Sequence, residues 1–337
     1  MAYTQTTGRP ARPRQSVTPA TGARSEAPTP CWHTARWAGP ARPGGPRAAE
    51  RLLRATTSKP SGPAQFHAAR VLLHTGNPHR TAVWCDELRL RAPSSAWAAG
   101  FGALRSEALL QLGETAAAEH EAAAAVAREA ACAHPTGLLP WSTAVLAESL
   151  IAQGRHEEAA AHLDRPAAVI TWSGLPWLRA RGRLHLARGR PRDALTLLSR
   201  AARLARRRGA GVLPYLSWRG DTAEALLALG RADRARTLLT EELAASAPGP
   251  RDRGIALRLL AATEEPGRRL PVLSRAATEL RRCKDHVELA QVLAECARTL
   301  DTLGEPATAA VFHRRAADLG AVGPAGLGNG LGTGVIA

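Results

Sequence analysis

Arg179 and Arg183 are the residues of this 337-residue chain whose type and spacing most directly suggest a binding site. They stand four residues apart, so on a helix both guanidinium groups project from one face. Two stacked cations of this kind would suit an acidic peptide or an anionic effector. Glu148 and Glu224 occupy the position equivalent to Arg183 in the two flanking copies of a repeated motif. The four residues therefore also fit a Glu–Arg–Glu ladder between neighbouring repeats, which contributes little where it is exposed, and we prefer this interpretation.

The cysteine and histidine residues do not have the spacing of a metal site. Cys283 and His286 share a helix face and Cys296 follows further along the chain, but the fourth ligand of a zinc site is missing. The five cysteines are scattered without a framework, as is typical of a reducing cytosol. No Ser/His/Asp or Cys/His set falls at matching positions. We therefore expect no catalytic residue, no metal ion, no cofactor and no enzymatic activity.

A repeated helix–turn–helix motif must position the charged residues. In each copy a helical run ends at a glycine, and a second helical run follows. The first five turn glycines lie 35 to 41 residues apart, and the last interval is 74 residues with a degenerate copy inside it. The expected turn glycines are Gly76, Gly113, Gly154, Gly189, Gly230, Gly267 and Gly304.

The spacing within one copy has a physical reason. Glycine ends the first helix because it adopts the left-handed conformation at little cost. A leucine such as Leu150 stands four residues before the glycine, and an alanine such as Ala159 stands five residues after it, where a small side chain lets two helices pack closely. One hairpin cannot bury its apolar face alone, so neighbouring hairpins must stack. The pattern predicts an all-α, tetratricopeptide-like solenoid of about seven helical hairpins.

The composition predicts two flanking segments without a folded core. The net charge of the chain is +16, and residues 1–63 contribute +8 of it together with ten of the 24 prolines. Such a segment buries too little apolar surface to fold, so we expect residues 1–63 to be disordered. Residues 322–337 form a Gly-rich tail that we expect to be flexible. The repeat domain is then expected to span residues 64–321.

The sequence also bears on localisation. The first residues lack the apolar segment of a secretory signal. No stretch of about 18 uncharged apolar residues is present, as a membrane-spanning helix would require. We therefore expect a cytoplasmic protein without a membrane association.

Residues 174–244 resemble the tetratricopeptide-like C-terminal arm of the large ATP-binding regulators of the LuxR family. The similarity is carried by SWRGDTAEALLALGRADRARTLLTEELA at 217–244 and by VELAQVLAECARTLDTLGEPATAAVFHRRAADLGA at 287–321. With weaker similarity it extends back to about residue 65. Members of this family also carry a P-loop ATPase and a DNA-binding helix-turn-helix. Neither lysine of this chain, Lys59 or Lys284, stands in a P-loop motif, and the Gly-rich tail stands where the helix-turn-helix would begin.

The resemblance implies a regulatory or sensory repeat protein in transcription regulation. It would bind a protein partner or a small effector in the concave groove of the repeats, and one candidate partner is a full-length regulator of the LuxR family. Specific DNA binding by this chain itself is not expected. Two alternatives stay open, a free-standing tetratricopeptide adaptor unrelated to transcription and a truncated remnant of a larger regulator.

Overall fold

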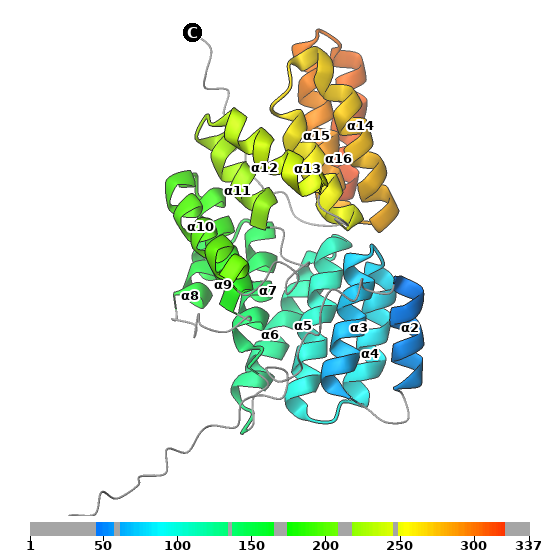
Figure 1. The fold of residues 1–337 in the computed structure, drawn as a ribbon. Coiled ribbons are helices and arrows are strands. Elements are labelled where there is room, and N and C mark those ends of the chain that lie inside the picture. The colour runs from blue at the N-terminus through cyan, green and yellow to red at the C-terminus, as the bar shows by residue number, and fades with distance from the viewer. Residues whose placement is uncertain are drawn as a thin grey trace, which may run out of the picture. The chain divides into compact units, whose positions relative to one another are not determined.

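The computed structural model describes residues 45–56, 61–133, 137–164, 174–207, 218–244 and 249–320. Within these ranges the chain forms helices and no strand, so the predicted all-α class is confirmed (Figure 1). No helix in the described ranges combines the length and apolar character that crossing a lipid bilayer requires. The helices are α2 (Pro46–Ala55), α3 (Gly62–His74), α4 (Pro78–Leu90), α5 (Ser95–Gln111), α6 (Thr115–Ala130), α7 (Leu139–Ala152), α8 (His156–Leu163), α9 (Gly174–Ala187), α10 (Pro191–Arg207), α11 (Trp218–Ala228), α12 (Ala232–Ala244), α13 (Pro250–Ala261), α14 (Pro266–Cys283), α15 (His286–Thr302) and α16 (Pro306–Gly320).

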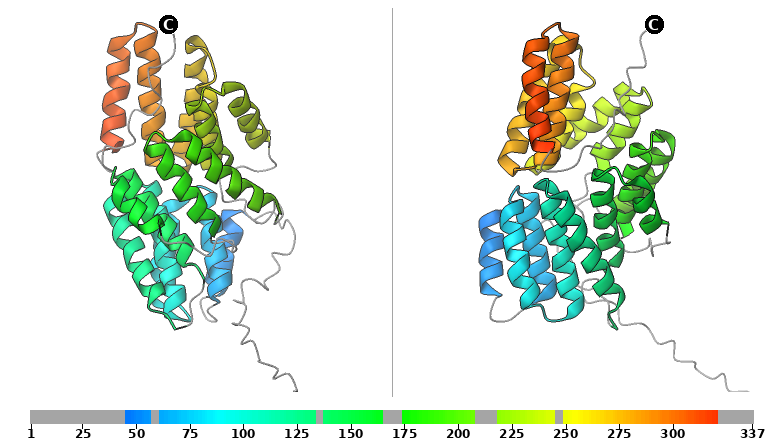
Figure 2. Two further views of the ribbon diagram at one scale, coloured as in Figure 1. Left: turned by 90° about the vertical axis from the view of Figure 1, so that its left-hand side faces the viewer. Right: turned by 180° about the vertical axis from the view of Figure 1, so that it is seen from behind.

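Fourteen of these helices pair into seven consecutive hairpins, as the repeat predicts. The pairs run from α3–α4 to α15–α16, and the two helices of each pair contact one another along their length. The first helices of neighbouring hairpins also pack on one another, for example α7 on α9 (Figure 2). The core is built largely from leucine and alanine.

Six of the predicted turn glycines end the first helix of their hairpin. Gly76, Gly113, Gly154, Gly189, Gly230 and Gly304 have φ values between +67° and +85°. In each of these turns the glycine N–H bonds to the carbonyl three residues earlier and the next N–H bonds to the carbonyl five residues earlier. This pair of hydrogen bonds defines the Schellman motif, which satisfies the carbonyl groups left open at the helix end.

Gly267 does not lie in a turn, so its assignment as a turn glycine was wrong. Helix α13 ends at Ala261, and Gly267 is the second residue of α14. Pro266 begins α14 because a proline needs no hydrogen-bond acceptor in the first helical position. The turn of this hairpin therefore consists of residues 262–265, where the N–H of Thr263 bonds to the carbonyl of Leu260 and the N–H of Glu264 bonds to the carbonyl of Ala261.

The small residue of each second helix is buried at the contact with the first helix. The alanines five residues after the turn glycines have no solvent exposure: Ala118, Ala159, Ala194, Ala235 and Ala309. Gly182 of α9 and Gly254 of α13 extend the same principle to the first helices. A Cβ atom added at Gly254 would lie 2.6 Å from Leu280 of α14, and one at Gly182 would lie 2.8 Å from Leu198 of α10. These glycines allow the paired helices to approach closely.

The helical part of the chain begins earlier than expected. Helix α2 lies inside the segment 1–63 that we predicted to be disordered, and α3 begins at Gly62, so the prediction was wrong for residues 46–55 and 62–63. Ala49 and Leu53 stand four residues apart on α2 and are buried in the core that includes Leu72 of α3. Residues 1–44 and the predicted Gly-rich tail at 322–337 lie outside the described residues.

Candidate functional site

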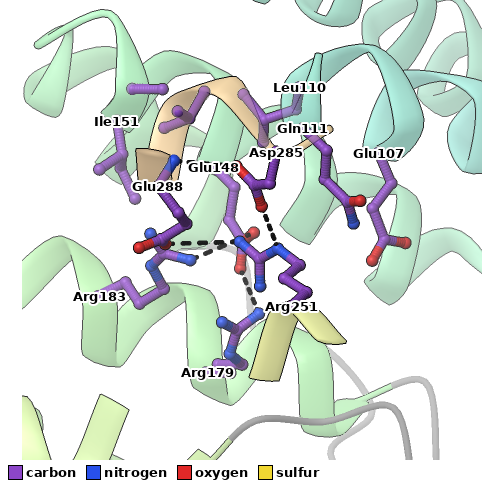
Figure 3. Close-up of a pocket in the computed structure, with 12 residues that line it drawn as sticks. Glu107, Leu110, Gln111, Glu148, Ile151, Arg179, Arg183, Arg251, Asp285 and Glu288 are labelled. Carbon is purple, nitrogen blue, oxygen red and sulfur yellow. Dashed lines mark hydrogen bonds and ion pairs between the residues drawn. The ribbon is translucent and has the colours of Figure 1, made fainter. Parts of the chain in front are cut away.

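A cavity of about 50 Å³ lies among the first helices α5, α7 and α9 and the later helices α13 and α15 (Figure 3). Most of its lining side chains are charged or polar. Its guanidinium groups belong to Arg179, Arg183 and Arg251, and its carboxylates belong to Glu107, Glu148, Asp285 and Glu288. Gln111 adds an amide. The cavity therefore brings together both predicted arginines, Arg179 and Arg183, and residues from distant parts of the sequence.

Arg179 is held between carboxylates of the two flanking hairpins. Its Nη1 lies 3.3 Å from Glu148 Oε1 on α7, and its Nε donates to Asp221 Oδ2 on α11. Its side chain is 13% exposed. Burial lowers the pKa of Arg179, but Asp221 and Glu148 outweigh that effect and hold it above its ordinary value. The ladder between repeats thus exists at Arg179, with Asp221 as the second carboxylate.

Arg183 is the less tightly held arginine of the predicted pair. Its Nη1 lies 3.8 Å from Glu148 Oε2, and its side chain is 23% exposed. Arg183 and Glu224 form no ion pair, although both lie in the described ranges. Glu224 is enclosed on α11, where burial raises its pKa against the opposing effect of Arg258 and Arg183. The predicted Glu–Arg–Glu ladder is therefore present at Glu148, whereas Asp221 takes the place expected for Glu224.

Arg251 and Asp285 form a second ion pair that was not predicted from the sequence. Arg251 Nε donates to Asp285 Oδ2 at 2.6 Å, and the Asp285 side chain is fully buried. Asp285 also begins α15, because its Oδ1 accepts the N–H of Glu288 at 2.9 Å. Lys284, in the left-handed conformation with φ 54°, reverses the chain between α14 and α15 within two residues. This short reversal places Asp285 at the cavity.

Glu288 connects this pair to Arg258. Arg251 Nη2 lies 3.5 Å from Glu288 Oε1, and Arg258 Nε lies 3.4 Å from Glu288 Oε2. Burial raises the pKa of Glu288, but Arg258 and Arg251 outweigh it and keep the carboxylate ionised. Arg258 also donates to Glu295 Oε1 at 2.8 Å. The ion pairs of α13 and α15 are therefore shielded from water and mutually compensated.

Glu107 and Gln111 are the two polar residues that α5 contributes to the cavity. They stand four residues apart on α5, and Figure 3 shows both side chains leaving the helix in the same direction. Glu107 Oε2 and Gln111 Oε1 are shielded from solvent and accept no hydrogen bond from any described residue. Burial raises the pKa of Glu107 above its ordinary range. An unsatisfied buried acceptor costs about 1–3 kcal/mol, so these two atoms mark an unfilled part of the site. Glu288 Oε2 also lacks a hydrogen bond, but Arg258 Nε lies 3.4 Å from it.

A register rule in the sequence would have identified Glu107. The position six residues before the turn glycine carries a charged residue in every hairpin that has such a glycine. The set is Arg70, Glu107, Glu148, Arg183, Glu224 and Arg298. The charged position is thus a property of the six first helices that end at a turn glycine.

Cys283 and His286 have structural roles rather than a shared ligand. Cys283 is fully buried, and its Sγ donates to the carbonyl of Leu280 at 3.3 Å. His286 Nδ1 lies 3.0 Å from the carbonyl oxygen of Leu112 at the end of α5. Across the described ranges, no three His, Cys, Asp or Glu side chains are grouped as metal ligands would be.

Comparison with known proteins supports the repeat architecture. The sequence pattern of the tetratricopeptide repeat matches residues 140–165, 176–200 and 219–240, which fall in the hairpins α7–α8, α9–α10 and α11–α12. The comparison with curated proteins gave no significant match.

Two solved structures share the fold over most of the chain. One is a Rap protein in complex with Competence and Sporulation Factor, with 14% sequence identity, a TM-score of 0.57, and coverage of 80% of this chain and 79% of that chain. The other is the apo form of the quorum sensor NprR from B. thuringiensis, with 18% identity, a TM-score of 0.51, and coverage of 81% and 82%. The protein is therefore a tetratricopeptide-like helical-repeat protein.

Proposed function

We propose that this protein is a regulatory helical-repeat protein that binds a protein or small effector at the charged cavity between its first helices. The observation that carries the proposal is the convergence of charged groups from five first helices on one small cavity, because such a cluster is costly to bury for packing alone. The proposal assigns the protein a binding role and no catalytic one.

The fold similarity supports the class of function. The Rap protein was solved in complex with Competence and Sporulation Factor, and NprR is a quorum sensor. By analogy, this chain would sense an effector through its repeats. The resemblance to the arm of LuxR-family regulators adds that the response would reach transcription through a partner, for which a full-length regulator of that family is a candidate.

The test is a pull-down with the full chain as bait, followed by titration of the recovered partner. Arg183→Gln is the informative variant because Arg183 is the most weakly paired arginine of the cavity. Arg179→Glu is unsuitable, since it would place a third carboxylate beside Glu148 and Asp221. Arg200→Gln is the matched control, because Arg200 lies exposed on α10.

The expected result is a partner whose Kd shifts at least about tenfold with Arg183→Gln, a change of about 1.4 kcal/mol in the binding free energy, and stays unchanged with Arg200→Gln. A DNA-binding regulator among the recovered partners would support the link to transcription. Recovery of partners that include no DNA-binding regulator would contradict that link. If the Kd of the partner does not change with Arg183→Gln, the cavity is excluded as its binding site. Absence of any bound protein or small molecule, with native mass spectrometry as the second readout, would contradict the binding function itself.

A further inference from the structure

The cations that line the cavity already have anionic partners. Arg179 contacts Glu148 and Asp221, and Arg251 contacts Asp285 and Glu288. Arg183 lies near Glu148. An incoming anion would therefore have to displace a carboxylate of the protein. The arginines of the cavity do not select for an anionic ligand.

The hydrogen-bond acceptors of α5 are in the opposite situation. Glu107 Oε2 and Gln111 Oε1 are both shielded from solvent and lack a donor among the described residues. Gln111 is only 6% exposed, and it lines the same cavity as Glu107. Two unfilled acceptors one helical turn apart can share one donor group. The missing group therefore carries N–H or O–H donors.

The charge of the cavity indicates which donor fits. Four carboxylates and three guanidinium groups line it, so a positively charged group balances the lining. Arg70, then Arg251 and Arg179, attract Glu107 over a longer range. Arg251 and Arg179 direct their hydrogen bonds to other carboxylates, and none of the three donates to Glu107 Oε2. A primary ammonium supplies three donors and one positive charge in a small volume. The cavity of about 50 Å³ has room for such a group, since one water needs roughly 10–15 Å³.

We propose that the cavity binds a primary ammonium group, which donates hydrogen bonds to Glu107 Oε2 and Gln111 Oε1. The inference rests on the proposed function and supplies the chemistry of the effector, an alkyl amine or a lysine side chain of a peptide. The Arg183 and Arg251 side chains remain 23% and 19% exposed, so the cavity is not sealed from solvent. A divalent metal ion fits less well, because it requires six or more oxygen ligands or bound waters.

Isothermal titration of the full chain with defined amines tests this proposal. The probes are 1,4-diaminobutane as a free amine and acetyl-Gly-Lys-Gly-amide as a lysine side chain in a peptide. Tetramethylammonium carries the same charge without N–H donors, and acetate is the anionic control. Glu107→Gln removes the charge with little change in shape. Glu305→Gln is the matched control, because Glu305 lies exposed in the last hairpin turn.

The expected result is binding of at least one amine probe at millimolar concentration, with Kd raised about tenfold or more by Glu107→Gln and unchanged by Glu305→Gln. Gln111→Leu should weaken the same probe, which provides a second variant if Glu107→Gln fails to fold. Binding of the diamine alone would identify a free amine as the ligand, and binding of the peptide would identify a lysine side chain.

Three outcomes would overturn the proposal. They are the absence of amine binding, equal Kd values for the Glu107→Gln and Glu305→Gln variants, and tetramethylammonium binding as tightly as the amines. The proposed function is tested separately by the partner titration. A partner that binds the Glu107→Gln variant normally but not the Arg183→Gln variant would leave the effector site in place and exclude only its ammonium specificity.

Discussion

Asp285 combines two structural tasks at the cavity. One carboxylate oxygen accepts the N–H of Glu288 at the start of α15, and the other accepts from the Arg251 side chain. Both contacts are removed from water, since the Asp285 side chain is fully buried. Loss of the carboxylate would leave the charge of Arg251 poorly compensated in a buried position. Breaking a buried pair in this way is more costly than the pair is stabilising.

Substitution of Asp285 separates these two tasks. Asp285→Asn keeps a good helix cap but removes the charge, and we expect it to lower the free energy of unfolding by about 3 kcal/mol. Asp285→Ala also removes the cap and should cost about 1 kcal/mol more. Urea unfolding followed by circular dichroism measures both. The control is Asp233→Asn, at an exposed position in the first turn of α12. It should change the free energy of unfolding by less than about 0.5 kcal/mol. A loss as large as that of Asp285→Asn would show that the effect is not specific to the buried pair.

His74 makes the stability of the protein dependent on pH. Burial, and then the nearby Arg70, Arg251 and Arg179, hold the pKa of His74 well below its ordinary value of 6.5. The folded protein therefore keeps this imidazole neutral, while the unfolded chain binds a proton as the pH falls through 6.5. Protonation of the unfolded state favours unfolding, so the stability present at pH 7 is lost toward acid.

We expect the His74 imidazole to lower the free energy of unfolding by about 2 kcal/mol between pH 7 and pH 5. The measurement is the difference between the unfolding free energies of the wild type and of His74→Gln at each pH, which cancels the groups that the two proteins share. The wild type should lose more stability than the variant as the pH falls. If the unfolding free energies of the wild type and of His74→Gln fall in parallel with pH, His74 has the same pKa in the folded and unfolded states.

The sequence located part of the site because of its regular register. Arg179, Arg183 and Glu148 were found since neighbouring hairpins repeat their spacing, and the structure places them together at one cavity. Asp221 was missed because it lies one helical turn before Glu224 on the same face, and register alone does not decide which of the two reaches an arginine. Which side chain pairs is set by the packing of α9 on α11, which lies beyond local sequence.

Turn glycines act at the scale of the helical hairpin. Gly230 has φ +70°, and a Cβ atom added there meets no other atom within 4 Å. Replacement by alanine therefore tests the backbone conformation without a steric clash. Gly267 offers the matched comparison, because it also has open space around it but lies within a helix.

We expect Gly230→Ala to lower the free energy of unfolding by about 1–2 kcal/mol, since alanine adopts the left-handed conformation at that cost. Gly267→Ala should instead raise stability by up to about 1 kcal/mol, because alanine favours the helix. Urea unfolding of the two variants gives the comparison. A loss of similar size in both would contradict the assignment of Gly267 to α14.

The fold was predictable where turn chemistry and core spacing agree. Six turns were located correctly because a glycine stands at a fixed offset from a leucine, from an alanine or, at four of the turns, from both. The α13–α14 hairpin departs from this rule. Because its turn was predicted at the wrong residue, Arg251 could not be aligned with the equivalent residues of the other first helices. The proline content of the first 63 residues obscured α2, although Ala49 and Leu53 have the four-residue spacing of a buried helix face.

At the scale of the whole repeat domain, early and late hairpins contact one another. His286 at the start of α15 lies within hydrogen-bond distance of the carbonyl of Leu112, 174 residues earlier in the chain. The backbone of Gly76 also lies close to Cys283 and Pro250, which a Cβ atom added to the glycine would meet at 2.7 and 3.0 Å. The later hairpins therefore pack against the turns that end α3 and α5 in the earlier hairpins.

The His286→Ala variant tests how far this contact couples the two regions. We expect a loss of about 0.5–1.5 kcal/mol for the hydrogen bond, with faster amide hydrogen exchange both at the end of α5 and in the first turn of α15. Exchange followed by mass spectrometry measures both segments in one experiment. His79→Ala, at an exposed position on α4, should leave both unchanged. Faster exchange in α15 alone would mean that the contact does not stabilise α5.

The placement of the cavity residues has a consequence for the order in which the protein matures. Glu107, Glu148 and Arg179 leave the ribosome early, but Arg251, Asp285 and Glu288 follow more than 70 residues later. Hairpins of a repeat protein can fold as they emerge, because most of their contacts are local. The cavity can close only once residue 288 has been synthesised and α15 has reached α5. A nascent or prematurely terminated chain would thus present folded repeats without the closed cavity.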